Sequence, residues 1–322
     1  MLQDSYGRTF KYLRLSVTDV CNYKCNYCLP DGYGCSEKVS HLSVGEIKKL
    51  VSAFADMGVE KVRITGGEPA LRRDLGEIIS SIKSIPGIKT VALTTNGHKL
   101  ENHIADWAER GLDAINVSCD SLDPRMFEAI TGRQKLDQIL KAIRLAHGLI
   151  DSVKVNVVIL KQFNLSQFER FVQWVKTESI AIRFIELMQT ADNQVFFSQN
   201  HVSSSKLQQK LKEGGWQPKR LAVTAGPAQE YWHPEFKGRL GFISPYAKDF
   251  CNTCNRLRIS SVGKLHLCLF SEQGHELRPL LKQVTHQQLC AHIEQLLSQK
   301  VEAHQLQQGS TGLTSHLAMI GG

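Results

Sequence analysis

The sequence predicts an α/β protein: an incomplete (βα)6 parallel barrel followed by a smaller C-terminal α+β domain. Over the first 190 residues, short β-rich segments alternate with longer amphipathic segments. Strands that are joined by helices in this way pair in parallel with right-handed crossovers, and six such units would curl into a partial barrel. After residue 190 the alternation stops, so we expect two domains, residues 1–190 and 191–322.

The N-terminal elements follow from this alternation, taken in order. We expect strands near residues 12–17, 61–65, 90–95, 113–118, 153–159 and 181–187. We expect helices near residues 43–57, 74–84, 100–110, 124–147 and 166–177. Ser43 and Asp74 precede two of these helices, and each has a glutamate three residues later, which is typical of a capping box.

Five successive strands carry a polar face. Because side chains alternate along a strand, Leu13 and Leu15 lie on one side of the first strand and Arg14 on the other. The polar faces are formed by Arg14 and Ser16, Arg63 and Thr65, Thr94 and Asn96, Asn116 and Ser118, and Lys154 and Asn156. A parallel strand covered on both sides would be apolar on both faces. We therefore expect the polar faces to line a lumen that holds a polar, anionic ligand.

The C-terminal part has a different pattern. Residues 189–205 are polar and are expected to form a linker. Later β-like segments lie near residues 229–233, 239–243, 256–260 and 264–268, and a helix is expected near 285–299. The chain then ends in a segment that contains glycine and serine.

Composition limits the class of protein. The chain has 42% hydrophobic and 22% charged residues, which is ordinary for a soluble globular protein. It has neither an apolar run of about 20 residues nor a basic-then-apolar N-terminus, so we expect a cytoplasmic protein with no membrane partner. The formal charge of +8 is compatible with solubility alone or with an anionic partner.

Cys21, Cys25 and Cys28 form the first of two cysteine sets. A disulfide framework is not expected in a cytosolic protein, and three closely spaced thiolates are typical of a soft metal site. Structural zinc takes four ligands, and this segment has no fourth cysteine. A 4Fe–4S cluster held by three cysteines keeps one iron open.

The run Gly66-Gly67-Glu68-Pro69 follows the second expected strand. Alone it could be a turn, since glycine and proline are common in loops. Together with the C-x3-C-x2-C spacing, it resembles the signature of the radical S-adenosylmethionine superfamily. In that superfamily the open iron chelates S-adenosylmethionine, the Gly-Gly-Glu-Pro motif contacts its methionyl amino group, and one electron cleaves it to a 5′-deoxyadenosyl radical.

Cys251, Cys254 and Cys268 form the second cysteine set, with the spacing C-x2-C-x13-C. This spacing also suits zinc, for which His266 or Cys290 could be a fourth ligand. The segment from Cys251 to Arg258, however, resembles the GTP 3′,8-cyclase family. The resemblance implies a second 4Fe–4S cluster whose open iron contacts the guanine base. Cys119 and Cys290 are expected to be structural.

The resemblance to this family covers nearly the whole chain. It includes the segments Asp4–Arg8, Tyr12–Asn22, Ile64–Pro69, Thr94–Gly97, Ser118–Leu122, Phe184–Met188 and Gly241–Ser244, and the terminal Gly321 and Gly322. Two segments depart from the family pattern. Gln189 follows Met188 where the family more often has proline, and residues 316–322 are not a close copy.

The resemblance implies specific contacts. S-adenosylmethionine is expected at Tyr27, Gly67, Ser118 and Met188. GTP is expected at Arg14, Arg63, Thr94, Lys154, Arg256, Leu257 and Arg258. The tail residues Gly321 and Gly322 are expected to enter the active-site cavity and to help hydrogen abstraction. Arg183 is a further family candidate, but simple alternation places it opposite Glu186 and Met188, so it is not included.

The implied reaction is the cyclisation of GTP to 3′,8-cyclo-7,8-dihydro-GTP, the first step of molybdenum cofactor (molybdopterin) biosynthesis. The implied cofactors are two 4Fe–4S clusters and S-adenosylmethionine. The implied partners are a low-potential one-electron donor, such as flavodoxin or ferredoxin, and the next enzyme, which makes cyclic pyranopterin monophosphate. The oligomeric state is not determined, and a homodimer is allowed.

Two alternatives remain open. A radical S-adenosylmethionine peptide maturase with an auxiliary cluster would usually carry a longer, seven-cysteine C-terminal pattern, which this chain lacks. A zinc-stabilised nucleic-acid-binding protein would need a basic stripe with exposed aromatic side chains. Aromatic residues are only 7% of the chain and no Lys/Arg block is present, so we expect no nucleic-acid partner.

Overall fold

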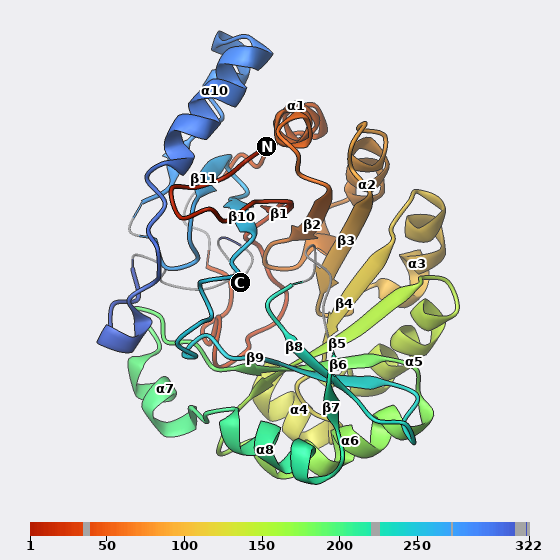
Figure 1. The fold of residues 1–322 in the computed structure, drawn as a ribbon. Coiled ribbons are helices and arrows are strands. Elements are labelled where there is room, and N and C mark those ends of the chain that lie inside the picture. The colour runs from red at the N-terminus through yellow and green to blue at the C-terminus, as the bar shows by residue number, and fades with distance from the viewer. Residues whose placement is uncertain (35–38, 220–225, 272, 313–319, 321–322) are drawn as a thin grey trace.

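One curved, mostly parallel sheet organises the molecule (Figure 1). The structure is a computed structural model that describes residues 1–34, 39–219, 226–271, 273–312 and 320. The six central strands are β1 (Tyr12–Ser16), β2 (Lys61–Thr65), β3 (Thr90–Thr95), β4 (Ala114–Ser118), β5 (Ser152–Ile159) and β6 (Ala181–Glu186). Neighbouring strands pair in parallel from β1 to β6, which confirms the predicted partial barrel.

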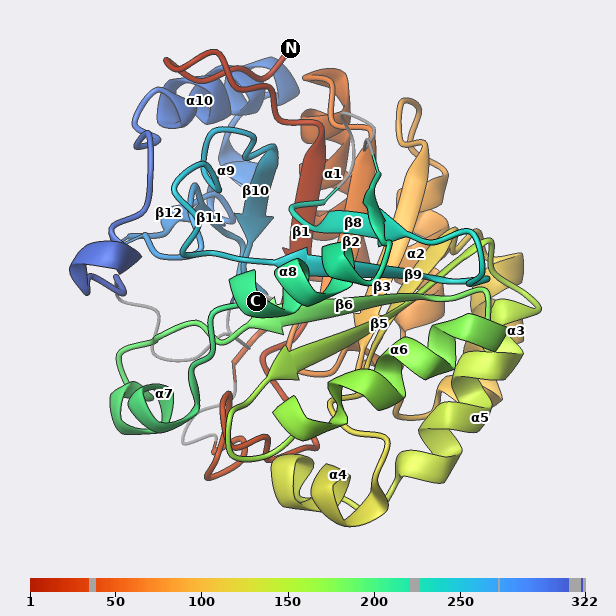
Figure 2. The ribbon, with the colours of Figure 1, turned by 60° about the horizontal axis from the view of Figure 1, so that its bottom comes forward.

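Helices cover the outer side of this sheet (Figure 2). They are α1 (Val44–Asp56), α2 (Leu75–Lys83), α3 (Leu100–Glu109), α4 (Pro124–Thr131), α5 (Leu136–His147) and α6 (Phe168–Thr177). Short 3₁₀ turns are η1 (Pro69–Leu71), η2 (Leu165–Gln167) and η3 (Leu306–Gln308). The apolar strand faces pack against these helices: Leu13, Leu15 and Val62, for example, are fully buried. The core therefore lies between the sheet and the helices, and the polar strand faces are left to the inside of the barrel.

Two details of the N-terminal helices differ from the prediction. The segment 124–147 is two helices, because Gly132 ends α4 in a left-handed conformation (φ +69°) that continues no helix. Ser43 forms the predicted capping box with Glu46. Asp74 does not cap α2; its carboxylate pairs instead with Arg72 at 2.5 Å.

Residues 189–205 are predicted to be a linker, but they are not a plain one. They contain α7 (Gln194–Asn200), and α8 (Ser205–Glu213) begins at their end. Asn193 closes the turn before α7, since its side chain accepts from the Thr190 amide at 2.8 Å and donates to the Met188 carbonyl at 3.0 Å. Phe196 and Phe197 then pack against a small apolar cluster that contains Leu160. The polar composition of this segment therefore did not reveal the two phenylalanines that pack it against the rest of the protein.

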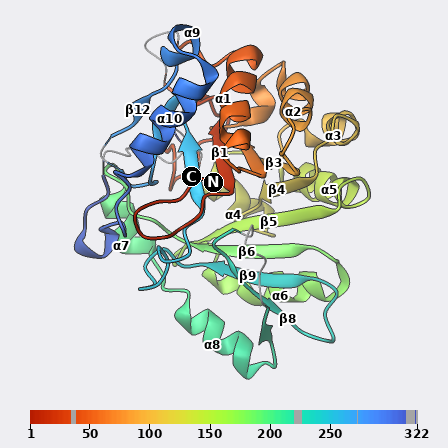
Figure 3. The same cartoon turned by 45° about the horizontal axis from the view of Figure 1, so that its top comes forward.

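The C-terminal strands extend the same sheet at both ends (Figure 3). At one end, β10 (Arg256–Ile259) pairs in parallel with β1, followed by β11 (Lys264–His266) and β12 (His275–Glu276). At the other end, β9 (Arg239–Ile243) pairs in parallel with β6, followed by β8 (Gln229–Trp232) and β7 (Gln217–Pro218). The helices α9 (Leu280–Gln283) and α10 (His286–Leu297) complete this part. Strands from before and after residue 190 therefore belong to one sheet.

No helix in the part of the chain that the structure describes is long and apolar enough to cross a bilayer.

Candidate active site

The first cysteine set lies in the loop after β1 and lines one cavity. This first cavity encloses about 940 Å³ of empty space, part of it open to solvent. Its lining includes Cys21, Cys25, Cys28, Tyr27, Gly67, Ser118 and Met188. The structure thus brings all four residues of the expected S-adenosylmethionine set together with the three thiols.

Main-chain hydrogen bonds to the end of α4 hold this loop. The amide of Lys24 donates to the Thr131 carbonyl and that of Asn26 to the Ile130 carbonyl, each at 3.1 Å. The guanidinium of Arg133 donates to the Asn22 carbonyl at 2.9 Å. The loop is therefore anchored from outside the barrel, while its thiols face the inside.

The two glycines of Gly66-Gly67-Glu68-Pro69 are required by close backbone contact. Gly66 has φ +152°, and a Cβ there would stand 2.2 Å from the Thr18 carbonyl oxygen. A Cβ on Gly67 would stand 2.3 Å from the Val20 carbonyl oxygen. Any side chain would force the motif away from the cysteine loop, because real atoms do not approach so closely.

The carboxylate of Glu68 faces the protein rather than the first cavity. It accepts hydrogen bonds from the amides of Ala70 (2.9 Å) and Asn96 (2.6 Å) and from the Thr95 hydroxyl (2.7 Å). Burial raises the pKa of Glu68 to about 7, against the lowering effect of these bonds. The side chain therefore connects the motif to the end of β3.

Asp120 is a residue of the first cavity that the sequence analysis missed. Its carboxylate accepts from the Tyr27 hydroxyl at 2.8 Å and from the Val158 amide at 2.8 Å. Burial raises its pKa to about 6. Its position just beyond the polar end of β4 was the available signal.

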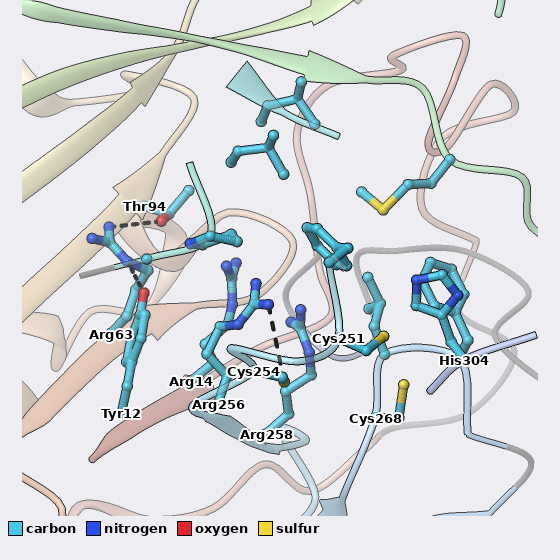
Figure 4. A pocket seen from close by; sticks show the side chains of 18 of the residues that line it. Tyr12, Arg14, Arg63, Thr94, Cys251, Cys254, Arg256, Arg258, Cys268 and His304 are labelled. Atoms are coloured by element: carbon cyan, nitrogen blue, oxygen red, sulfur yellow. Dashed lines mark hydrogen bonds between the residues drawn. The ribbon is translucent and has the colours of Figure 1, made fainter. Parts of the chain in front are cut away.

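The second cysteine set lines a second cavity (Figure 4). This cavity encloses about 970 Å³ of empty space, again partly open to solvent. Its lining includes the three thiols of Cys251, Cys254 and Cys268 together with Arg14, Arg63, Thr94, Arg256 and Arg258. Neither His266 nor Cys290 lines it, and Cys290 packs instead against α1. Phe250, Phe270 and His304 form an aromatic part of the wall that the sequence analysis did not identify.

Three arginines stand side by side across neighbouring strands. Arg258 on β10 pairs in register with Arg14 on β1, and Arg14 pairs in register with Arg63 on β2. Burial lowers the pKa of Arg14 to about 10 and lowers that of Arg258 well below its usual range. Like charges at this spacing repel one another, so the row favours an anionic ligand between them. Figure 4 shows Arg14, Arg256 and Arg258 close together beside Cys254.

Arg63 is held in one orientation. Its Nε donates to the Tyr12 hydroxyl at 2.6 Å, and its Nη1 donates to the Leu93 carbonyl (3.0 Å) and the Thr94 hydroxyl (3.1 Å). Burial alone would raise the pKa of Tyr12, but Arg63, Arg14 and Lys61 lower it to about 7. Tyr12 also lines the second cavity and was not among the predicted site residues.

Two expected GTP contacts do not line the second cavity with their side chains. Leu257 is fully buried in the apolar core, because alternation turns it away from Arg256 and Arg258. Lys154 is half-buried, and its ammonium donates to the Ser152 hydroxyl at 2.9 Å. Burial, then Arg183 and Arg63, lowers the pKa of Lys154 to about 7.

Arg183, which the sequence analysis set aside, does line the second cavity together with Ile185. These two residues share a face of β6. The strand ends at Glu186, and Met188, beyond its end, also lines both cavities. Strand alternation could not be extended past the end of the strand. Gly321 and Gly322 lie outside the described residues; the carbonyl of Ile320 accepts from Arg258 at 3.3 Å.

The two cavities share a wall. Thr94, Asn156, Ile185 and Met188 line both of them. The two cysteine sets therefore line adjoining cavities. A ligand bound at one set can contact a ligand bound at the other across these four side chains.

This arrangement, a partial parallel barrel with a three-cysteine loop and a glycine-rich turn at its strand ends, defines a radical S-adenosylmethionine protein. The sequence profile of the Radical SAM superfamily matches residues 15–175, and that of Molybdenum Cofactor Synthesis C matches residues 180–306. Superfamily membership implies S-adenosylmethionine and an iron–sulfur cluster. Three cysteines line each cavity, and their thiols are soft donors of the kind that hold an iron–sulfur cluster with one iron left open.

The most detailed likeness is to curated relatives. The chain is 52% identical over 325 residues to the GTP 3′,8-cyclase of Vibrio cholerae serotype O1, covering 99% of this chain and 97% of that protein. It is 49% identical over 323 residues to the GTP 3′,8-cyclase of Yersinia pestis, covering 100% and 99%. The chain therefore belongs to the GTP 3′,8-cyclase family.

A solved structure supports the fold alone. Streptococcus suis SuiB matches with a TM-score of 0.62 at 15% identity over 85% of this chain. The chain spans 65% of the length of that structure. A second SuiB structure, bound to S-adenosylmethionine, matches with a TM-score of 0.56 at 14% identity over 87% of this chain and 64% of that one.

Proposed function

We propose that this chain catalyses the cyclisation of GTP to 3′,8-cyclo-7,8-dihydro-GTP, the first step of molybdenum cofactor biosynthesis. The observation that carries this proposal is the wall shared by the two cavities. An intramolecular cyclisation started by a radical from a second molecule needs both molecules in one closed space. Proximity of this kind is where a protein contributes most to rate when cofactors supply the chemistry.

The first cavity would hold the cofactor. Cys21, Cys25 and Cys28 would ligate a 4Fe–4S cluster, with Tyr27, Gly67, Ser118 and Met188 around S-adenosylmethionine. When bound and reduced by one electron, the cluster and S-adenosylmethionine would supply the radical chemistry for hydrogen abstraction from the ribose of GTP. The absence of a side chain at Gly67 lets the motif lie directly against the cysteine loop, where a Cβ would stand 2.3 Å from the Val20 carbonyl oxygen.

The second cavity would hold the substrate. Cys251, Cys254 and Cys268 would ligate a second 4Fe–4S cluster beside the guanine base, within a wall that includes Phe250 and Phe270. Arg14, Arg63, Arg183, Arg256 and Arg258 would hold the triphosphate through paired hydrogen bonds, with Thr94 at the shared wall. Lys154, which acts electrostatically with Arg183 and Arg63, would add charge. The main chain of Leu257 would contribute the remaining contact, since its side chain lies in the core.

Further partners and the cellular location complete the proposal. A low-potential one-electron donor such as flavodoxin or ferredoxin would reduce the clusters, and the product would pass to the enzyme that makes cyclic pyranopterin monophosphate. We place the protein in the cytoplasm and allow a homodimer. Gly321 and Gly322 would reach into the interior, and a protein truncated before them should bind GTP normally but form far less product.

An anaerobic assay tests the proposed function. Purified protein should carry about eight irons and eight sulfides per chain, from two four-iron clusters. With GTP, S-adenosylmethionine and a reductant, it should form the cyclic product and 5′-deoxyadenosine. Zinc without sulfide at the second cysteine set, or no cyclic product from fully reconstituted protein, would contradict the proposal.

A further inference from the structure

A buried ion pair spans three strands at the edge of the second cavity. Nη2 of Arg183 on β6 lies 2.8 Å from Oε1 of Glu230 on β8, and both side chains are at least 90% buried. Between these strands runs β9, and Gly241 on β9 is the register partner of both Arg183 and Glu230. The two charged residues are therefore second neighbours in the sheet, not adjacent ones.

Gly241 leaves the space through which the pair forms. Adjacent strands lie roughly 4.8 Å apart, so Arg183 and Glu230 must meet across about twice that distance, over the top of β9. A Cβ on Gly241 would stand 3.4 Å from Cγ of Glu230, on the same face of the sheet. A branched side chain at this position would occupy the path between the two charged groups.

The opposite face of the same three strands is packed and apolar. Phe184, Phe242 and Tyr231 lie there, with ring centroids 5.5 Å apart for Phe184 and Phe242 and 6.0 Å apart for Phe242 and Tyr231. This packing fixes the strands, and so the backbone positions of Arg183 and Glu230. The ion pair is consequently a feature of one face only, the face toward the second cavity.

Arg183 has cationic neighbours that would otherwise repel it. Burial lowers the pKa of Arg183, and the positive charge of Arg63 also lowers it. Burial likewise lowers the pKa of Lys154, and the charges of Arg183 and Lys61 in turn lower it too. Glu230 opposes this repulsion, and Arg239 approaches its second oxygen at 3.6 Å. Nη1 of Arg183 points toward Gly226, which itself lines the second cavity, so one side of the guanidinium is anchored and the other faces the cavity.

We infer that Glu230 is a positioning residue for the triphosphate of the substrate: it acts across Gly241 to hold Arg183 in its cavity-facing orientation among the other cations. This inference rests on the proposed function, because it takes GTP as the ligand of the second cavity. It assigns to β8, which contributes no side chain to the cavity lining, a role in substrate affinity.

A double-mutant cycle in the reconstituted full-length enzyme tests this inference. The variants are Glu230→Gln, Arg183→Gln and the double variant, with GTP and guanosine affinities measured anaerobically. Glu230→Gln should weaken GTP binding about ten-fold and leave guanosine binding unchanged, since guanosine has no phosphates. In the Arg183→Gln background, Glu230→Gln should change GTP affinity by less than about two-fold, because the residue through which it acts is gone.

Two further variants sharpen the result. Glu276→Gln is the matched control: Glu276 forms a cross-strand pair with Lys264 at 2.8 Å near the other end of the sheet, but both side chains are about half exposed. It should bind GTP as the wild type does. Gly241→Val should reproduce the loss seen with Glu230→Gln, with iron content and 5′-deoxyadenosine formation reporting intact cofactor binding. If Gly241→Val does not fold, the double-mutant cycle of Glu230 and Arg183 still tests the inference.

The outcomes separate this inference from the proposed function. Unchanged GTP affinity in Glu230→Gln, an equal loss for guanosine, or an equal loss in the Arg183→Gln background would overturn the positioning role while the wild type still makes product. A wild type that binds GTP but makes no product would overturn the proposed function instead. A wild type that does not bind GTP would contradict both.

Discussion

The two cysteine-lined cavities share a wall but differ in charge. Around the first cysteine set, burial raises the pKa of Cys21 and Cys25, and the nearby carboxylates Glu68 and Asp120 raise it further. Around the second set, burial opposes ionisation of Cys254, but Arg256 and Lys300 lower its pKa below the usual range. Carboxylates thus act on two thiols of the first set and cations on Cys254 of the second, whereas burial raises the pKa of Cys251 in the second set.

This difference indicates how the interior sorts its ligands. The first cavity has the Asp120 carboxylate in its lining, which suits the amino group and sulfonium charge of S-adenosylmethionine. The second offers the row of arginines from β10, β1 and β2, which suits a triphosphate. Electrostatics alone would direct each ligand to its own side of the shared wall.

The largest expected effect comes from Gly67→Ala, which should distort the first cavity and leave the second unchanged. Its Cβ would stand 2.3 Å from the Val20 carbonyl oxygen and 2.6 Å from that of Asp19, so the motif must move away from the cysteine loop. Product formation should fall by about 100-fold or more. GTP affinity should be unchanged, measured by anaerobic binding. Equal losses of GTP and S-adenosylmethionine affinity would show that the two cavities are not independent.

Arg258→Ala tests the second cavity in the same way. Removing this buried guanidinium should weaken GTP binding by about 1.5–3 kcal/mol, the scale of a charge-assisted hydrogen bond. S-adenosylmethionine affinity and the content of both clusters should persist. Arg144→Ala, on α5 in the outer helix layer, is a control that should change neither affinity. If Arg258→Ala binds GTP as tightly as the wild type, the assignment of the arginine row is wrong.

The pH dependence of GTP binding sharpens the contrast further. Lys154 has a pKa of about 7, so it is charged below pH 7 and neutral above it. A bound triphosphate favours the charged form, and binding should take up a proton near and above neutral pH. GTP affinity should fall as pH rises above about 7, by at most ten-fold per unit. Lys154→Met should lose this slope; an identical slope in both proteins would exclude Lys154 as its source.

The smallest expected effect concerns the thiols of cluster-free protein. Because Cys254 has a lowered pKa and Cys25 a raised one, Cys254 should be alkylated several-fold faster by iodoacetamide at pH 7.5. Peptide mass spectrometry after a short exposure gives both rates in one sample. Arg256→Gln should slow Cys254 and leave Cys25 unaffected. Equal rates in the unmodified chain would mean that the charge difference does not reach the sulfur atoms.

Much of the fold and of the candidate site could be predicted from local pattern. Alternation located the six central strands, and the polar faces of β1, β2 and β3 identified Arg14, Arg63 and Thr94 as residues of the interior. The spacing of the cysteines and the two glycines after β2 predicted residues that the structure places together around the first cavity. These inferences succeed because a strand turns successive side chains to opposite faces whatever it pairs with.

Pairing between distant strands was decided only by the tertiary structure. Nothing local to residues 256–259 shows that β10 joins β1 and so sets Arg258 beside Arg14, 244 residues away in the chain (258 − 14). Alternation assigned Arg183 to the wrong side of the site because β6 ends at Glu186, so the alternating pattern does not extend to Met188. Glu230 belongs to no sequence motif. Their contact exists because Gly241 is the register partner of both. Register is a property of the assembled sheet, so a single strand's residues cannot determine it.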